Sequence, residues 1–191
     1  MNAALRAKAM LVDPFAEWLR IEQESGDPAF LLSRYVAVLA LIPALASFIG
    51  ASLIGAQVSG TTVRASLFDG LFGAIFGYVE AVASVLLLGL IIDVLAPLFG
   101  GRRDFDSAFK LAVYSYTPVW LAGIFLLLPG LRFLVLTGFY GVYVLALGLP
   151  RLMHAPEQKS STFVVVIAAC AFAITYAAAA LQHAIFGTPG L

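Results

Sequence analysis

The chain has 191 residues, of which 62% are hydrophobic and only 12% are charged, and its mean hydropathy is +0.99. A soluble domain is about 45–50% apolar and about 25% charged, so this composition excludes a water-soluble globular fold and predicts one domain in lipid. There are 11 basic and 11 acidic residues, and this net charge of zero argues against nucleic acid as a partner.

The N-terminal residues 1–34 are expected to form a cytoplasmic region with one short amphipathic helix. Asp13 and Pro14 are a typical helix start, with an acidic N-cap followed by proline at the first helical position. An apolar face is expected on one side, with Trp18 at the depth of the lipid headgroups, and Glu17 is expected to point away from it. Two interpretations stay open: a docking surface for a partner protein, or an anchor or lid packed on the bundle. The residues expected to form this surface are Phe15, Trp18, Leu19 and Glu22.

Five apolar runs are long enough to cross a membrane, which takes about 20 helical residues. We therefore expect an all-α bundle of five transmembrane helices over residues 35–187. Polar residues separate the runs, except that Pro129 and Gly130 form a tight turn between the third and the fourth. The five runs are residues 35–57, 71–99, 109–128, 131–149 and 162–186.

The basic residues predict the orientation of the bundle in an inner (plasma) membrane. Excess Lys and Arg mark cytoplasmic segments, so we expect a cytoplasmic N-terminus and a C-terminus outside. One side carries only Arg64 and Arg132. The other side carries nine: Arg6, Lys8, Arg20, Arg34, Arg102, Arg103, Lys110, Arg151 and Lys159.

Glu80 is the most informative polar residue within the spans. A carboxylate there costs about 2.5–3.5 kcal/mol on insertion scales, so it is expected to face the bundle interior. Its depth predicts that Tyr140 and Ser47 can reach it. It serves either to handle protons or cations or to bridge helices by hydrogen bonds.

Asp93 and Lys110 lie at equal distances from the turn between the second and third runs, which predicts an ion pair or, for Lys110 alone, snorkelling to the interface. Lys110, Tyr114, Thr117 and Leu121 recur at helical spacing and predict one polar face that lines a water pocket or packs on a neighbour. Proline removes a backbone donor, so kinks are expected at Pro43 and Pro118.

No pattern predicts a catalytic centre, a metal site or a cofactor. Cys170 is a single cysteine in an apolar run, and His154 and His183 have no Cys or Asp at ligand spacing. The Walker loop and the GxGxxG, HExxH and GxSxG motifs are all absent from the sequence. We therefore expect a protein that is not an enzyme.

Several stretches of the sequence carry a resemblance to a known family. The stretches are residues 18–24, Tyr35, residues 41–43 and 48–50, residues 99–101, Phe105, residues 108–109 and 112–118, Tyr140, Gly141, Gly148 and Leu149. They resemble the Yip1 family of small multi-span membrane proteins, in its bacterial branch, over about residues 13–180. The resemblance implies a five-span bundle with a cytoplasmic N-terminus. It also implies a relation to eukaryotic proteins that look like partners of Rab GTPases, but those proteins have a longer cytosolic region with an acidic-aromatic motif that this sequence lacks.

The leading hypothesis is a non-enzymatic scaffold or adaptor in the membrane. It would bind a membrane or cytoplasmic protein through residues 13–24 and 100–107, with self-association left open. The alternative is a small transporter or channel that uses Glu80, Lys110 and Tyr114. Apart from such a protein, the lipid bilayer is the expected partner.

Overall fold

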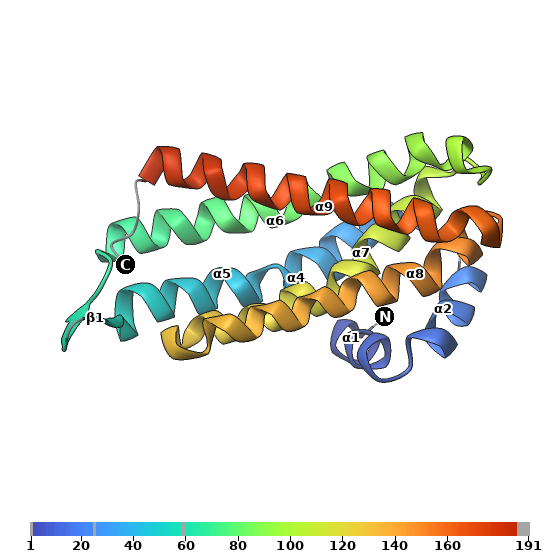
Figure 1. The fold of residues 1–191 in the computed structure, drawn as a ribbon. Helices are drawn as coiled ribbons and strands as arrows, with labels where there is room; N and C mark the ends of the chain where they lie inside the picture. The colour runs from blue at the N-terminus through green and yellow to red at the C-terminus, as the bar shows by residue number, and fades with distance from the viewer. Residues whose placement is uncertain (1, 25, 59, 187–191) are drawn as a thin grey trace.

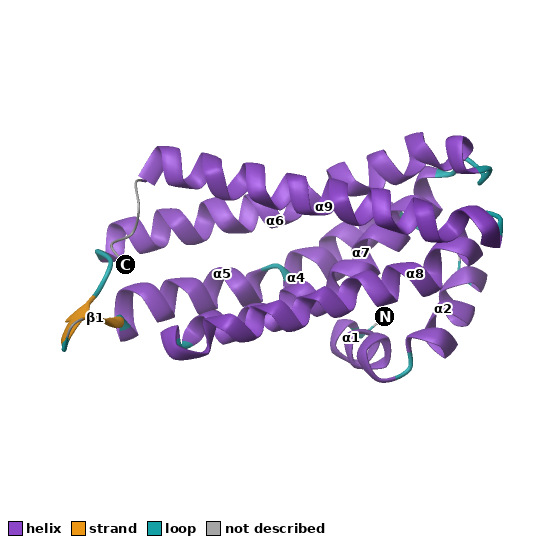
Figure 2. Cartoon of the chain, viewed as in Figure 1, coloured by secondary structure: helices purple, strands orange, loops and turns teal. Residues whose placement is uncertain are grey.

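The computed structural model describes residues 2–24, 26–58 and 60–186, and it is an all-helical bundle (Figures 1 and 2). Five helical segments are long and apolar enough to cross a membrane, which confirms the predicted number. They are Pro28–Ile54, Leu67–Phe99, Phe105–Leu127, Pro129–Leu152 and Glu157–Ala184.

Two helices precede the spans. The first is α1 (Ala3–Val12), and the second is α2 (Pro14–Gln23). The predicted helix start is confirmed, since Asp13 Oδ1 accepts a hydrogen bond from the Ala16 N–H at 3.1 Å.

The first span is built from short pieces: α3 (Pro28–Leu31), η1 (Leu32–Val36), α4 (Ala37–Leu39), α5 (Leu41–Phe48) and η2 (Ile49–Ile54). It begins earlier than predicted, because Asp27 caps a new helix at Pro28 by accepting from the Ala29 N–H at 3.0 Å. The helix is interrupted at Ala40, three residues before Pro43. Pro43 has no backbone N–H to donate within the helix, and a kink was expected there for this reason.

A β-hairpin follows the first span, in a segment where only a polar connection is expected from the sequence. Strands β1 (Ala56–Val58) and β2 (Thr61–Val63) pair antiparallel, with Gln57 opposite Thr62. The second span is α6 (Leu67–Leu95) with η3 (Ala96–Phe99).

The third span is α7 (Phe105–Ala122) with η4 (Gly123–Leu127), and α7 continues through Pro118 without interruption. The fourth span is η5 (Pro129–Phe139) with α8 (Tyr140–Leu152), and the fifth is α9 (Glu157–Phe186). The predicted tight turn at Pro129 is confirmed, since the Leu131 N–H donates to the Leu128 carbonyl at 2.8 Å.

The bundle has two distinct ends (Figure 1). One end carries the β-hairpin of β1 and β2, and we call it the hairpin end. The other end carries most of the basic residues, and we call it the basic end. At the basic end, residues 100–104 join η3 to α7, residues 153–156 join α8 to α9, and α1 and α2 pack on the side of the bundle. The two connections at the basic end are held together where the Arg102 N–H donates to the Met153 carbonyl at 2.8 Å.

The spans differ in how much of their surface other helices cover. In the apolar stretch of each span, 56% of the residues are buried in the span that contains α7, but only 11% are buried in the span that contains α9. Helix α7 therefore forms the centre of the bundle, while α9 exposes apolar side chains such as Val165, Phe172 and Tyr176 to lipid.

Candidate functional site

The basic end carries most of the residues that the sequence predicted to be functional, and Trp18 is central to their arrangement. Its side chain is fully buried, and its indole N–H donates to the Val144 carbonyl of α8 at 3.0 Å. Gly148 makes room for the ring, because a Cβ atom there would lie 2.5 Å from Trp18 Cε2. Trp18 is therefore not available on the surface of α2 as a contact residue for a partner, because α2 packs it against its own bundle.

A second correction concerns the two faces of α2. Glu17, expected to point away from the apolar face, is 4% exposed and forms an ion pair with Arg6 of α1. It also accepts a hydrogen bond from Arg20 at 3.2 Å. Burying a carboxylate is tolerated when it is paired and hydrogen-bonded, and both conditions are met by these two arginines.

Arg6 connects this ion pair to the rest of the site. Its guanidinium also pairs with Glu24 and lies 5.8 Å from the centre of the Tyr114 ring. Burial opposes its charge, but the hydrogen bond to Glu24 and the charges of Glu24 and Glu17 outweigh burial and raise the pKa of Arg6. The ion pairs thus join α1 to α2, a pair of helices that we call the N-terminal hairpin, and the guanidinium contacts α7 at the Tyr114 ring.

Aromatic rings continue this contact into the bundle. Trp18 and Tyr114 meet edge-to-face with ring centres 6.0 Å apart, and Tyr114 meets Tyr35 of the first span at 5.1 Å. The Tyr35 hydroxyl shares a hydrogen bond of 2.8 Å with Thr117. The face of α7 predicted from helical spacing therefore points toward the first span and the N-terminal hairpin.

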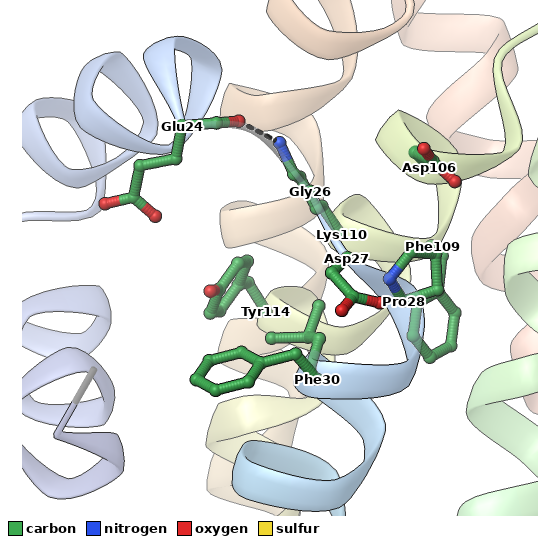
Figure 3. Close-up of a pocket in the computed structure, with 10 residues that line it drawn as sticks. Glu24, Gly26, Asp27, Pro28, Phe30, Asp106, Phe109, Lys110 and Tyr114 are labelled. Carbon is green, nitrogen blue, oxygen red and sulfur yellow. Dashed lines mark hydrogen bonds between the residues drawn. The ribbon is translucent and has the colours of Figure 1, made fainter.

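A cavity of about 110 Å³ opens beside Lys110 at the basic end (Figure 3). Asp27, Asp106 and Tyr114 line it together with Lys110, whose Nζ donates to the backbone carbonyl of Glu24. Lys110 is thus bound to the segment that joins α2 to the first span, and it contributes a positive charge to a wall with two carboxylates.

The predicted ion pair between Asp93 and Lys110 is wrong. Asp93 pairs with Arg103 at 3.1 Å, while Lys110 is directed toward Glu24. Equal distance from a turn fixes equal depth in an antiparallel pair, but it does not fix the direction in which each side chain leaves its helix. Arg103, on the connecting loop, reaches Asp93 instead.

The predicted partners of Glu80 are also wrong. The Tyr140 hydroxyl donates to the Leu11 carbonyl at 3.2 Å, and the Ser47 hydroxyl donates to the Ala44 carbonyl at 2.9 Å. The polar side chain nearest to Glu80 on its own helix is Ser84, which is buried one turn along α6 on the same face as Glu80.

Sequence reasoning missed two residues near Glu80. Tyr116 of α7 is 9% exposed and lies near both the Glu80 carboxyl group and Thr175 of α9, whose hydroxyl donates to the Ala171 carbonyl of its own helix at 3.0 Å. Tyr116 is adjacent to the helical face that the spacing selected, so periodicity alone directed attention away from it. Together the four side chains form a polar cluster between α6, α7 and α9, which we call the Glu80 cluster.

The other three proposed contact residues of α2, Phe15, Leu19 and Glu22, are exposed. Phe15 is 53% exposed and Leu19 is 39% exposed. Arg151, at the end of α8, lies 4.5 Å from the centre of the Phe15 ring and 4.0 Å from Glu22. Partner binding by these residues stays a prediction.

No group of three or more His, Cys, Asp or Glu side chains that could hold a metal ion occurs among the described residues. In the same part of the chain, we identify no arrangement of nucleophile, base and oxyanion donors of the kind that hydrolytic or transfer chemistry requires. The site offers aromatic packing, a buried ion pair and a small charged cavity.

Comparisons with known proteins agree with this architecture. Residues 8–180 match the Yip1 domain. Two curated relatives are both described as inner membrane protein YohC, from Escherichia coli K12 and from Escherichia coli O6:H1. Each is 29% identical over 155 residues, covering 78% of this chain and 80% of the relative. No solved structure matches the chain.

Proposed function

Because the chain belongs to the Yip1 family, we propose that this integral, multi-pass inner membrane protein is a non-enzymatic scaffold that binds a protein partner at its basic end. The observation that carries the proposal is the complete burial of Trp18 between α2 and α8. It fixes the N-terminal hairpin on the bundle, so the surface beside it is preorganised. A preorganised surface loses less conformational entropy when it binds.

We further propose that the basic end faces the cytoplasm. Nine of the 11 Lys and Arg residues lie in segments at or near this end, and an excess of basic residues marks the cytoplasmic side. The structure brings these segments together, since α1, α2, the loop after η3 and the end of α8 all lie at the basic end (Figure 1).

The partner surface that we propose combines two exposed parts of the basic end. One is the outer face of α2 with Phe15 and Leu19, and the other is the loop with Arg102, whose side chain is 68% exposed. Aromatic and arginine side chains are both enriched at protein interfaces.

Proximity labelling in the native membrane tests this proposal. Arg102→Glu and Leu19→Glu should each remove a defined set of labelled proteins that the wild-type chain retains. Arg132→Glu is the matched control, because Arg132 is an exposed arginine of the fourth span and lies on the side that carries only two basic residues. An identical labelled set for the wild type, Arg102→Glu and Leu19→Glu would contradict the proposed surface.

The Glu80 cluster supports a second candidate function, a small proton or cation transporter. A carboxyl group within a span, close to Ser84, Tyr116 and Thr175 on three helices, is the arrangement expected of an intramembrane proton relay. Flux across liposomes tests it: wild-type protein should conduct protons or cations, Glu80→Gln should not, and Asp69→Asn at the hairpin end should behave as the wild type. Absence of flux with wild-type protein eliminates this candidate.

A further inference from the structure

An apolar groove runs between α1 and the first span. Ala3, Ala7 and Leu11 form one wall, and Val38, Leu39 and Ile42 form the other. Its volume is about 470 Å³, within the range of about 300–1,000 Å³ that ligand sites usually have.

The groove carries one charged residue, Lys8, and this side chain is exposed. Arg34 precedes Val38 by about one helical turn and is also exposed. Within residues 2–24, 26–58 and 60–186, neither basic side chain forms an ion pair, so both charges are available to an anion.

The sequence of the first span indicates the depth of the groove in the membrane. The first span has 27 residues, more than the roughly 20 that cross the apolar layer, and its continuous apolar sequence starts at Tyr35. Val38 is therefore expected just inside the hydrocarbon and Ile42 about one turn deeper, and the flexible Lys8 side chain is expected to extend toward the headgroups.

The apolar surface of the groove is continuous with the lipid-facing surface. Val12 and Leu5 on α1 are 73% and 65% exposed, and Val38 and Leu41 on the first span are 51% and 43% exposed. At the deep end of α1, the Leu11 carbonyl accepts a hydrogen bond from Tyr140, which satisfies a backbone group that lipid could not.

We propose that this groove binds one anionic phospholipid, with an acyl chain along the apolar walls and the phosphate at the Lys8 ammonium group. The lipid fills the space between the N-terminal hairpin and the first span and stabilises the docked position of α1. This inference goes beyond the proposed scaffold function and holds for any partner at the basic end.

Native mass spectrometry of the full-length protein in detergent tests the proposal directly. The probes are phosphatidylglycerol, which is anionic, and phosphatidylcholine, which has no net charge. Wild-type protein should retain one phosphatidylglycerol more strongly than phosphatidylcholine. Lys8→Ala should weaken retention of phosphatidylglycerol about fivefold, the effect of about 1 kcal/mol for one basic residue at an anionic surface.

A second variant fills the groove without removing charge. Ala4 lines the groove and is exposed, so Ala4→Trp, or Ala4→Leu where tryptophan lowers the melting temperature, should abolish retention. Lys159→Ala and Ala169→Trp, which alter exposed positions of α9, are the matched controls and should retain the lipid.

Three results would overturn the proposal. One is equal retention of the two lipids by wild-type protein. Another is retention by the Ala4 variants, which would place the lipid elsewhere. The third is unchanged retention in Lys8→Ala, which would remove the assignment of the phosphate to Lys8.

Discussion

Replacing Trp18 by alanine should release the N-terminal hairpin from the bundle. The side chain is fully buried and donates a hydrogen bond to Val144. Removing a buried tryptophan from a core costs about 3–5 kcal/mol, which corresponds to a change of about two to four orders of magnitude in an equilibrium constant. Because Trp18 joins α2 to α8, the loss should appear in the docking equilibrium of the hairpin more than in the five spans.

Hydrogen exchange followed by mass spectrometry measures this equilibrium. In Trp18→Ala, amide protection of α1 and α2 should fall by that factor while protection of α7 is retained. Trp18→Phe keeps a ring but loses the donor, and it should lower protection by a factor corresponding to about 0.5–1.5 kcal/mol. Leu19→Ala, on the same helix but 39% exposed, is the control and should change the free energy by only about 0.5 kcal/mol.

Two outcomes of this experiment would refute the reasoning. Unchanged protection of α1 and α2 in Trp18→Ala would show that the hairpin is not held by this side chain. An equal loss of protection in Leu19→Ala would show that α2 responds to any truncation, without a specific contribution from the buried indole.

Three further predictions concern the contacts around Trp18 and the start of α7. Gly148→Val should place a side chain against the Trp18 ring and destabilise the docked N-terminal hairpin by about 1–3 kcal/mol. Amide hydrogen exchange of α1 and α2 should then rise as in Trp18→Ala, and unchanged exchange would contradict the close approach of Gly148 to the ring. A double-mutant cycle of Arg6→Met and Glu17→Gln, read from the melting of the detergent-solubilised protein, should give a coupling energy of about 1–3 kcal/mol, and additive effects would exclude the buried pair. Burial opposes ionisation of Asp104, but hydrogen bonds from Arg102 and Ser107 outweigh burial and hold the pKa of Asp104 below its ordinary value. The ionised carboxylate therefore stabilises the folded state. This contribution to the free energy of unfolding is fully present above about pH 3.9 and is lost as the pH falls through the lower pKa of the folded state. Asp104→Asn should therefore show a smaller fall in melting temperature between pH 6 and pH 3 than the wild type, and equal falls would exclude this contribution.

The sequence was sufficient to predict the five spans and the start of α2. A run of about 20 apolar residues has few alternatives in a chain of this composition, because lipid requires every backbone group to be satisfied within a helix. The cap at Asp13 is likewise local, since it depends on a side chain and a backbone N–H three residues apart.

The contacts between helices could not be predicted in the same way. Counting residues gave the depth of Asp93, Lys110 and Glu80, but depth does not define which neighbour a side chain faces. Glu17 was expected to point away from the apolar face, because helical periodicity separates a polar face from an apolar one but does not show that another helix covers the polar face. Its partner Arg6 lies on α1, for which no helix had been predicted.

The β1–β2 hairpin was missed because three-residue strands give too short an alternation to distinguish them from a polar loop. Its turn contains Gly60 with a φ of +83°, a conformation that glycine adopts without strain. The surrounding Thr61 and Val63 are β-branched and favour a strand.

The central claim, that the N-terminal hairpin is docked on the end of α8 in the native membrane, is open to one direct measurement. The guanidinium carbon of Arg151 lies 4.5 Å from the centre of the Phe15 ring. In a Cys170→Ser background, a short thiol cross-linker should therefore join cysteines that replace Phe15 and Arg151 in intact membranes. Cysteines replacing Phe15 and Arg132 should not be joined. Failure of the first pair to cross-link, or equal cross-linking of both pairs, would contradict the docked arrangement.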